Sequence, residues 1–515
     1  MPRGILPEKP LKRARTVGID MRYRKTGYCS APPGWASFAA MHARLQAVRK
    51  DTGPLWVNDT HSALNRTPVE RIVEPRSAGE TADAVMAAAR RGEPLAVCGA
   101  RHAMGGQQFL SGGMLLDMRR MNQVRWFDRG CALFEVEAGI TWPDVIRGYL
   151  SLQRGPGHAC GIRQKQTGAD RLTLGGAAAA NIHGRGLTAR PFVEDIEGLE
   201  VVTATGEILR CSREENTELF RHVVGGYGLF GVVTAVTLRL VPRLKVQRHV
   251  TRLAIDELID AFDARIAAGH LYGDFQFATA PDGADFLRTG VLSSYRPIDI
   301  DRPLPQNQLR LSQRDWNELL TLAHSDKQAA FQRFTDFYLA THGQLYWSDT
   351  HQLNLYLEDY HGALDHRLGA AVRGSEMITE LYVPRARLVA FMDDVRRDFR
   401  MNGVDFIYGT VRLIEREHDT ALAWARDDWA CVIFNLHIDH RPEDIGRAAT
   451  HFRRLIDHAL RHQGSYFLTY HRHARREQVL AAHPQMPEFL AAKLRFDPAE
   501  RFQTDWYRSL KELLA

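Results

Sequence analysis

Three glycines in one short stretch constrain the fold of this chain more than any other feature. Residues 223–241 read VVGGYGLFGVVTAVTLRLV, in which Gly226, Gly228 and Gly231 have the spacing G-x-G-x-x-G. In a dinucleotide-binding fold of the Rossmann type, a strand precedes such glycines and a helix follows them, so that a pyrophosphate lies at the helix N-terminus. The sequence on either side of these glycines predicts the opposite order.

The residues before the glycines predict a helix, and the residues after them predict a strand. Ser212 and Glu215 form an S-x-x-E capping box, which is typical of a helix start. Apolar residues follow at helical spacing, and Gly225 is a suitable C-terminal stop. Downstream, VVTAVTLRLV is β-branched and alternates between apolar and polar residues, as a strand does. The order helix, glycine turn, strand therefore argues against an NAD site here.

The totals describe a globular protein with a basic leader. The chain has 515 residues, enough for two or more domains of about 150 residues each. Its net charge is +6, and residues 1–26 contain eight basic and two acidic residues, which is the whole excess. We therefore expect a solvated tail and no nucleic-acid partner. The leader has no apolar segment of a secretory signal, and no apolar run approaches the roughly 20 residues of a membrane span.

Cysteine and histidine usage indicates a reducing compartment and no metal site. The six cysteines are scattered and none stands in a C-x-x-C motif. Such scatter in a large chain is typical of cytoplasmic proteins. The chain has 22 histidines, yet none has the spacing of H-E-x-x-H, and His471 and His473 in HRHARRE are more typical of surface charge.

The first half of the chain has a βαβ pattern. We expect a strand at Arg71–Glu74, a capping box at Ser77 and Glu80, a helix at Thr81–Arg91 and a buried strand at Pro94–Ala100. Further on, IEGLEVVTATGEILRC predicts a hairpin. From residue 243 to residue 465, aromatic residues increase and strands mix with helices without a βαβ rhythm, which favours an α+β second domain.

The stretch QTGADRLTLGGAAAANIHGRG, residues 166–186, consists mostly of small side chains. Such a tract allows the backbone to approach a flat, bulky ligand. The alternative is a tightly packed helix, since four consecutive alanines suit one. The flanking glycines and Asn181 to Gly184 favour the ligand contact.

Three motifs in register resemble a known family. VCGARHAMGGQQF, LTLGGAAAANIHGRG and GGYGLFGVVTAVTLRLVPR, in this order, resemble the FAD-binding domain of the vanillyl-alcohol-oxidase superfamily, also called the p-cresol-methylhydroxylase (PCMH) type. The motifs are most similar to the alditol and aldonolactone oxidase branch. The resemblance implies an α+β fold with a leader at 1–67, an FAD domain at 68–242, a substrate (cap) domain at 243–465, and a C-terminal segment at 466–515 that packs on the FAD domain.

The resemblance also implies which residues bind FAD. The loop around His102 would wrap the pyrophosphate with backbone N–H groups, the tract around Gly175 would lie along the pyrophosphate and rings, and the backbone of Val233 would contact the adenine end. The implied FAD residues are Gly99, Ala100, Arg101, His102, Ala103, Met104, Gly105, Gly106, Gln107, Asp170, Thr173, Gly175, Gly176, Ala179, Asn181, His183 and Val233.

In the alditol-oxidase branch, a histidine at the position of His102 bonds covalently to the flavin 8α-methyl group. A neutral imidazole is a competent nucleophile for this bond. Ala103 stands where serine is usual. The alternative is a histidine that only donates a hydrogen bond to the phosphate or the ring edge.

The implied reaction is oxidation of a CH–OH group of a polyol, sugar or lactone, with hydride transfer to flavin N5 and O2 as acceptor. The implied catalytic residues are Arg412 in YGTVRLIE, Glu380 and His471, each of which could also be an ordinary ion-paired or surface residue. Thr410 stands where the family has a glutamate, which puts a simple alditol substrate in question. Two alternatives stay open: a dehydrogenase that acts on a sugar-lipid with another acceptor, and a catalytically impaired flavin or carbohydrate binder.

Overall fold

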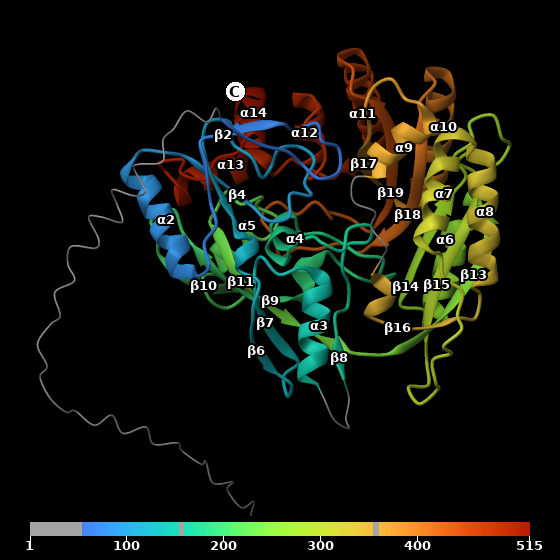
Figure 1. Ribbon diagram of the computed structural model, residues 1–515, viewed down its shortest axis with the longest axis horizontal. Coiled ribbons are helices and arrows are strands. Elements are labelled where there is room, and N and C mark those ends of the chain that lie inside the picture. The colour runs from blue at the N-terminus through green and yellow to red at the C-terminus, as the bar shows by residue number, and fades with distance from the viewer. Residues whose placement is uncertain (1–53, 154–158, 354–359) are drawn as a thin grey trace, which may run out of the picture. The chain divides into compact units, whose positions relative to one another are not determined.

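In the computed structural model, residues 54–153, 159–353 and 360–515 are described (Figure 1). The basic leader and Cys29 lie outside these residues. The five described cysteines, Cys98, Cys131, Cys160, Cys211 and Cys431, form no disulfide with one another. None of the described helices has both the length and the apolar character that are needed to cross a membrane.

The first elements form a small parallel sheet. The strands β3 (Arg71–Val73), β5 (Met114–Asp117) and β4 (Leu95–Cys98) are hydrogen-bonded in that order. The helix α2 (Ala78–Arg90) connects β3 to β4, and its N-cap Ser77 accepts a hydrogen bond from the backbone N–H of Glu80. A hairpin of β1 (Leu55–Val57) and β2 (Thr67–Val69) precedes this sheet. The predicted βαβ pattern is confirmed.

A second sheet is antiparallel and has five strands. Their order is β10 (Ile208–Ser212), β9 (Ile196–Val202), β11 (Val232–Arg239), β7 (Leu133–Glu137) and β6 (Val124–Asp128). The predicted hairpin is formed by β9 and β10. Three helices accompany this sheet, α3 (Trp142–Leu152), α4 (Leu174–Ala180) and α5 (Thr217–Val223), and β8 (Cys160–Gly161) pairs with β12 (Val241–Pro242).

The helix, glycine turn and strand around residue 226 are confirmed, but the predicted helix start is wrong. α5 ends at Val223, Gly225, Gly228 and Gly231 have positive φ angles of 75°, 76° and 151°, and β11 follows. Ser212 is the last residue of β10, and its hydroxyl accepts hydrogen bonds from two backbone N–H groups of the connecting turn. The S-x-x-E pattern therefore closes this turn and does not cap the helix.

The largest sheet is antiparallel and has eight strands. Their order is β16 (Leu345–Trp347), β13 (Lys245–Ala254), β15 (Thr289–Ile298), β14 (Tyr272–Phe277), β18 (Phe406–Ile414), β19 (Trp429–Asp439), β17 (Gly374–Pro384) and β20 (Ser465–Tyr466). Its helices are α6 (Leu258–Ala267), α7 (Gln313–Ser325), α8 (Lys327–Ala340), α9 (Tyr360–Leu368), α10 (Leu388–Asn402) and α11 (Pro442–Arg461). Figure 1 shows α7 and α8 side by side, and both contact strands of this sheet.

The end of the chain returns to the first sheet. Beyond α12 (Arg476–Ala482) and α13 (Met486–Phe496), the backbone N–H of Leu95 donates to the carbonyl of Arg501, and the N–H of Gln503 donates to the carbonyl of Leu95. The last helix, α14 (Asp505–Leu514), follows. The mixture of separate sheets and helices confirms the predicted α+β class, while the domain boundaries drawn from sequence stay a proposal.

Candidate functional site

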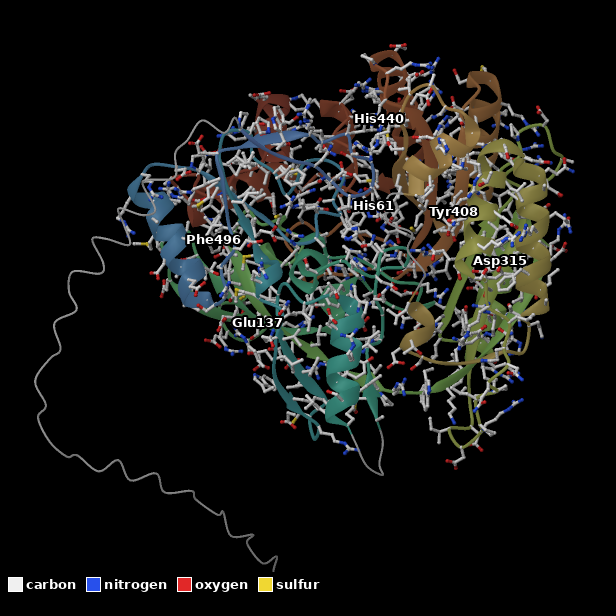
Figure 2. All side chains as sticks on the ribbon, in the orientation of Figure 1. His61, Glu137, Asp315, Tyr408, His440 and Phe496 are labelled. Carbon is white, nitrogen blue, oxygen red and sulfur yellow. The ribbon has the colours of Figure 1, made fainter. Side chains whose placement is uncertain are left out.

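A cavity of about 520 Å³ lies between the first two sheets and the eight-stranded sheet. His61 and Tyr408, both labelled in Figure 2, line it from segments that are far apart in sequence. Its wall on one side consists of the loop after β4 and of α4, and on the other side of residues from β14, β17 and β18. Tyr227, Gly228 and Val233 of the third motif line it as well, so all three sequence motifs meet at one cavity.

The loop after β4 is pressed against the N-terminus of α4. A Cβ atom on Gly99 would lie 1.9 Å from Thr173 Oγ1, so that only glycine permits this approach. Arg101 has a φ of 62°, which is uncommon for a residue with a side chain and is found most often at functional sites. The backbone N–H groups of Ala100 and Ala103 donate to no described residue. The loop therefore offers free donors at the cavity wall.

The alanine tract is a short helix whose small side chains face the cavity. α4 ends at Asn181, which has a φ of 46°. The N–H of Gly175 donates to the carbonyl of Ala138, and a Cβ on Gly175 would lie 2.8 Å from Ala138 Cβ. Gly176 and Ala179 line the cavity. The tract is therefore a packed helix that also lines the cavity with small side chains, while its contact with a ligand stays a prediction.

The structure brings most of the predicted site residues to this cavity, but not all of them. Those that line it are Gly99, Ala100, Arg101, His102, Ala103, Met104, Gln107, Thr173, Gly175, Gly176, Ala179, Val233, Glu380 and Arg412. Those that do not are Gly105, Gly106, Asp170, Asn181, His183 and His471.

The residues outside the lining have other partners. Gly105 lies against the C-terminal segment, where its added Cβ would be 2.2 Å from the carbonyl oxygen of Tyr470. Asp170 forms an ion pair with Lys165 at 2.7 Å. Asn181 Oδ1 accepts a hydrogen bond from the N–H of Val193. Gly105 and Gly106 thus do not line the cavity, and the wrapping of a ligand by the rest of the loop stays a prediction.

His471 lies beside the cavity wall, and its neighbour Tyr470 lines the cavity. The His471 ring is buried and stacks on His473, with 5.5 Å between the ring centroids. Burial lowers the pKa of His471 to about 4. The predicted C-terminal contribution to the cavity therefore comes from a tyrosine one position earlier.

Glu380 is the centre of a hydrogen-bonded cluster. Its Oε1 accepts hydrogen bonds from His183 Nε2 and from the Tyr382 hydroxyl, both at 2.6 Å, and its Oε2 accepts one from the Tyr470 hydroxyl at 3.1 Å. The thiol of Cys431 lies 3.4 Å from Oε1. Burial by itself would raise the pKa of Glu380, but His183 and these donors outweigh it and lower that pKa to about 2. Glu380 is thus an ionised and fully engaged carboxylate.

Arg412 lies on β18 at the same wall and has an unused donor. Its side chain is 6% exposed, and its Nε has no hydrogen-bond partner among the described residues. Thr410, on the same strand, is buried opposite Gln276 and is not among the residues that line the cavity. Arg412 therefore offers a buried cation to a ligand, while Thr410 does not replace the missing glutamate.

His102 is buried next to a second histidine. Its Nδ1 lies 2.8 Å from His61 Nε2 and 3.3 Å from the Thr60 hydroxyl. Burial and the neighbouring His61 place the pKa of His102 well below its usual value, and burial lowers that of His61 to about 4. Both rings are therefore neutral near pH 7, which is the state in which a ring nitrogen can act as a nucleophile.

Comparison with known proteins indicates which ligand the cavity wall around α4 and the loop after β4 could bind. Residues 69–212 match the family described as the FAD binding domain. Residues 69–212 are therefore a domain of this FAD-binding family, and the chain is similar to FAD-linked oxidoreductases over part of its length. The flat wall at α4, the free N–H groups at Ala100 and Ala103 and the unused donor of Arg412 fit a flavin dinucleotide, which has a planar ring system and an anionic pyrophosphate.

Individual FAD-linked oxidoreductases are similar over part of their length. An uncharacterized oxidoreductase of the fasciation locus of Rhodococcoides fascians is 36% identical over 169 residues, 33% of this chain and 37% of that protein. Cytokinin dehydrogenase 7 of Oryza sativa subsp. japonica is 32% identical over 197 residues, 37% and 36% of the two chains. L-gulono-1,4-lactone dehydrogenase of Mycobacterium tuberculosis is 28% identical over 231 residues, 44% and 50%. The matches cover half or less of each relative.

Sequence reasoning missed several residues of the cavity wall. Glu376 and Glu380 both line the cavity and stand four residues apart on β17, so that strand alternation could have shown that they share a face. Tyr470 is adjacent to the predicted His471. His61 and Arg185 also line the cavity, and no motif around them could have indicated it.

Proposed function

We propose that this FAD-linked oxidoreductase oxidises a CH–OH group of a sugar-like, polyol or lactone substrate. The observation that carries the proposal is the Arg412 guanidinium, which is buried at the cavity wall with a free Nε donor. A fixed cation at the reacting centre would stabilise the alkoxide that forms when the substrate hydroxyl loses its proton, or the negative charge that the flavin ring gains with the hydride. The lactone dehydrogenase among the relatives supports a lactone as one substrate class.

FAD would supply the hydride acceptor. The N–H groups of Ala100 and Ala103 would bind its pyrophosphate, and Gly176 and Ala179 would lie along its ring system. Arg412 would donate to an oxygen atom at the reacting centre. Glu380, with a pKa near 2, is a weak base, so we assign it a positioning role: it holds His183 and Tyr470 in place.

We further propose that His102 binds the flavin covalently. Its neutral ring lies in the loop that faces the cavity, and His61 and Thr60 hold its Nδ1 side. Acid precipitation of the purified protein tests this proposal. Flavin colour in the pellet that follows a peptide containing His102, and that is lost from the pellet of His102→Ala, is expected. Colour that stays in the supernatant with the unmodified protein would refute the tether without affecting FAD binding.

The apolar part of the cavity favours a second candidate, a substrate with an apolar portion such as a sugar-lipid. Trp316, Leu319, Phe331 and Phe334 of α7 and α8 line the cavity together with Phe277. Several relatives are named dehydrogenases. In this alternative, an organic or protein acceptor would replace O2.

Anaerobic mixing distinguishes these candidates. Polyols, sugars, aldonolactones and glycolipids are added one at a time, and the visible flavin absorption is followed. Bleaching identifies the substrate class, and peroxide formed when O2 is then admitted indicates an oxidase. Bleaching by none of them would contradict the proposal and favour a flavin or carbohydrate binder. Arg412→Met should slow bleaching by about 10²- to 10³-fold, and Arg412→Lys by less.

A further inference from the structure

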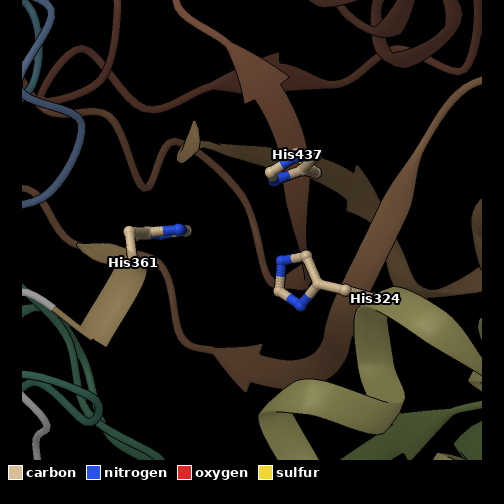
Figure 3. Close-up of side chains that lie close together, drawn as sticks. All are labelled: His324, His361 and His437. Atoms are coloured by element: carbon tan, nitrogen blue, oxygen red, sulfur yellow. The ribbon is translucent and has the colours of Figure 1, made fainter. Parts of the chain in front are cut away.

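We infer that His324, His361 and His437 form a binding site for a divalent transition-metal ion of the zinc type. The three residues come from different elements: α7, α9 and β19. Figure 3 shows that their rings turn toward one another. One ring nitrogen from each lies within 4.8 Å of the other two.

Each of these rings has an unused nitrogen. His324 Nε2, His361 Nδ1 and His437 Nδ1 are buried and have no hydrogen-bond partner among the described residues. An imidazole nitrogen without a proton is the usual zinc ligand. Each of the three rings thus presents one buried nitrogen that a cation could take as its partner.

The second nitrogen of each ring faces an acceptor. His324 Nδ1 lies 2.8 Å from the carbonyl oxygen of Leu320, which fixes the tautomer with the Nε2 lone pair free. His361 Nε2 lies 3.7 Å from Glu376 Oε1, and His437 Nε2 lies 3.7 Å from Asp439 Oδ1. A carbonyl or carboxylate hydrogen-bonded to a ligating histidine is typical of metal sites, where it orients the ring. His324 has such a bond, whereas the carboxylates beside His361 and His437 lie beyond hydrogen-bond distance.

The spacing of the rings requires only a small adjustment. Two nitrogens that bind one tetrahedral zinc ion at about 2.0–2.1 Å are roughly 3.3 Å apart. The nitrogens lie within 4.8 Å of one another, so they must approach by up to about 1.5 Å to bind one ion. His361 and Glu376 line the cavity, so that the fourth position of the ion would be open to the space in which a substrate binds.

The ligand set selects the class of ion. Three neutral imidazoles suit zinc, copper or nickel, whereas magnesium and calcium prefer oxygen ligands. The positive charges nearby belong to Lys327, on the His324 side, and to Arg373, on the His361 side. The carboxyl groups of Asp405 and Asp439 offset them, whereas burial raises the pKa of Glu376 to about 7, so that this carboxyl group is only partly ionised at neutral pH.

Equilibrium dialysis of the full chain without an affinity tag against Zn2+, followed by elemental analysis, tests the site. We expect one bound Zn2+ per chain for the unmodified protein. The variant His324→Gln/His437→Asn should bind about 100-fold more weakly or not at all, since it lacks two of three ligands. The single variant His361→Asn tests the third ligand with a smaller change.

His270→Gln is the matched control. His270 is also buried, has a free Nδ1, and lies in another histidine cluster, 4.8 Å from the His249 ring. It should keep the bound zinc. Flavin content and circular dichroism show whether each variant is folded. No zinc above background on the unmodified protein, or a full equivalent retained by the folded double variant, would overturn the inference. Neither outcome depends on catalytic activity.

Discussion

Two groups of buried ionisable side chains stand at the wall of the same cavity, and they differ in how far their hydrogen-bonding capacity is used. Around Glu380, both carboxylate oxygens accept hydrogen bonds, and His183 uses both ring nitrogens. Around His361, each of the three imidazoles has one buried nitrogen without a hydrogen-bond partner among the described residues. The first group thus has its partners within the chain, whereas the second is the group for which we propose a metal ion.

The difference follows from the cost of burying polar groups. A buried polar atom without a partner costs about 1–3 kcal/mol, and three of them in one place indicate a missing partner. The Glu380 cluster stabilises the fold through hydrogen bonds to a buried carboxylate, and the chain itself supplies their donors. Removal of one of its members should therefore cost stability, whereas the histidine cluster should gain stability when an ion is added.

The largest expected effect is at Glu380. Glu380→Gln removes the charge that faces His183 and should reduce the free energy of unfolding by about 3–5 kcal/mol, as for other broken buried ion pairs. Glu376→Gln, on the same face of β17, keeps an acceptor for the Asn435 amide and should cost less than about 1 kcal/mol. Urea denaturation of both variants measures the difference. If both substitutions reduced the free energy of unfolding equally, Glu380 would be no more important for stability than Glu376.

Addition of zinc should have the next largest effect. A ligand that binds only the folded state at 100 times its Kd stabilises the protein by about 2.7 kcal/mol. Urea unfolding with and without saturating Zn2+ should show this gain in the unmodified protein and in Glu380→Gln. His324→Gln/His437→Asn should show none. If Zn2+ increased the free energy of unfolding of this double variant by the same amount, the ion would bind at a site other than these three histidines.

Acid should affect the two groups differently. The folded pKa of Glu380, about 2, lies below its usual 4.5, so its contribution to stability is complete above about pH 4.5 and is lost as pH falls toward 2. Between about pH 6 and pH 3 the loss should be ~2 kcal/mol. The unfolding free energy of Glu380→Gln should lack this component. A pH dependence identical to that of the unmodified protein would contradict the ion pair.

Single hydroxyl groups should have the smallest effect. Tyr470→Phe removes the longer hydrogen bond to Glu380, at 3.1 Å, and Tyr382→Phe removes the shorter one, at 2.6 Å. Hydrogen bonds to charged groups contribute about 1.5–3 kcal/mol, and we expect a cost at the lower end of this range because Glu380 keeps its other donors. We expect Tyr382→Phe to cost more than Tyr470→Phe in thermal or urea unfolding. The reverse order would mean that the Tyr470 hydroxyl contributes more to the free energy of unfolding than its longer hydrogen bond indicates.

Local sequence patterns predicted most helices and strands correctly, and they failed where the same pattern occurs in two different local structures. The alternation of VVTAVTLRLV and the Ser77 capping box appear as β11 and as the N-terminus of α2. The same S-x-x-E pattern at Ser212 forms a turn, because the hydroxyl satisfies N–H groups before the helix begins. Sequence spacing cannot distinguish these two outcomes, since both satisfy the same donors.

The sequence by itself determined the α+β class, the non-Rossmann use of the glycines at 226–231, and the flavin-binding motifs, because these depend on residues close together in the chain. Tertiary structure alone decided that Tyr470, rather than His471, lines the cavity and that His183 pairs with Glu380 from 197 positions away. It also assembled His324, His361 and His437, whose separation in sequence hid any metal pattern. Long-range pairing arises from sheet order and helix packing, and no local pattern encodes which distant side chains these bring into contact.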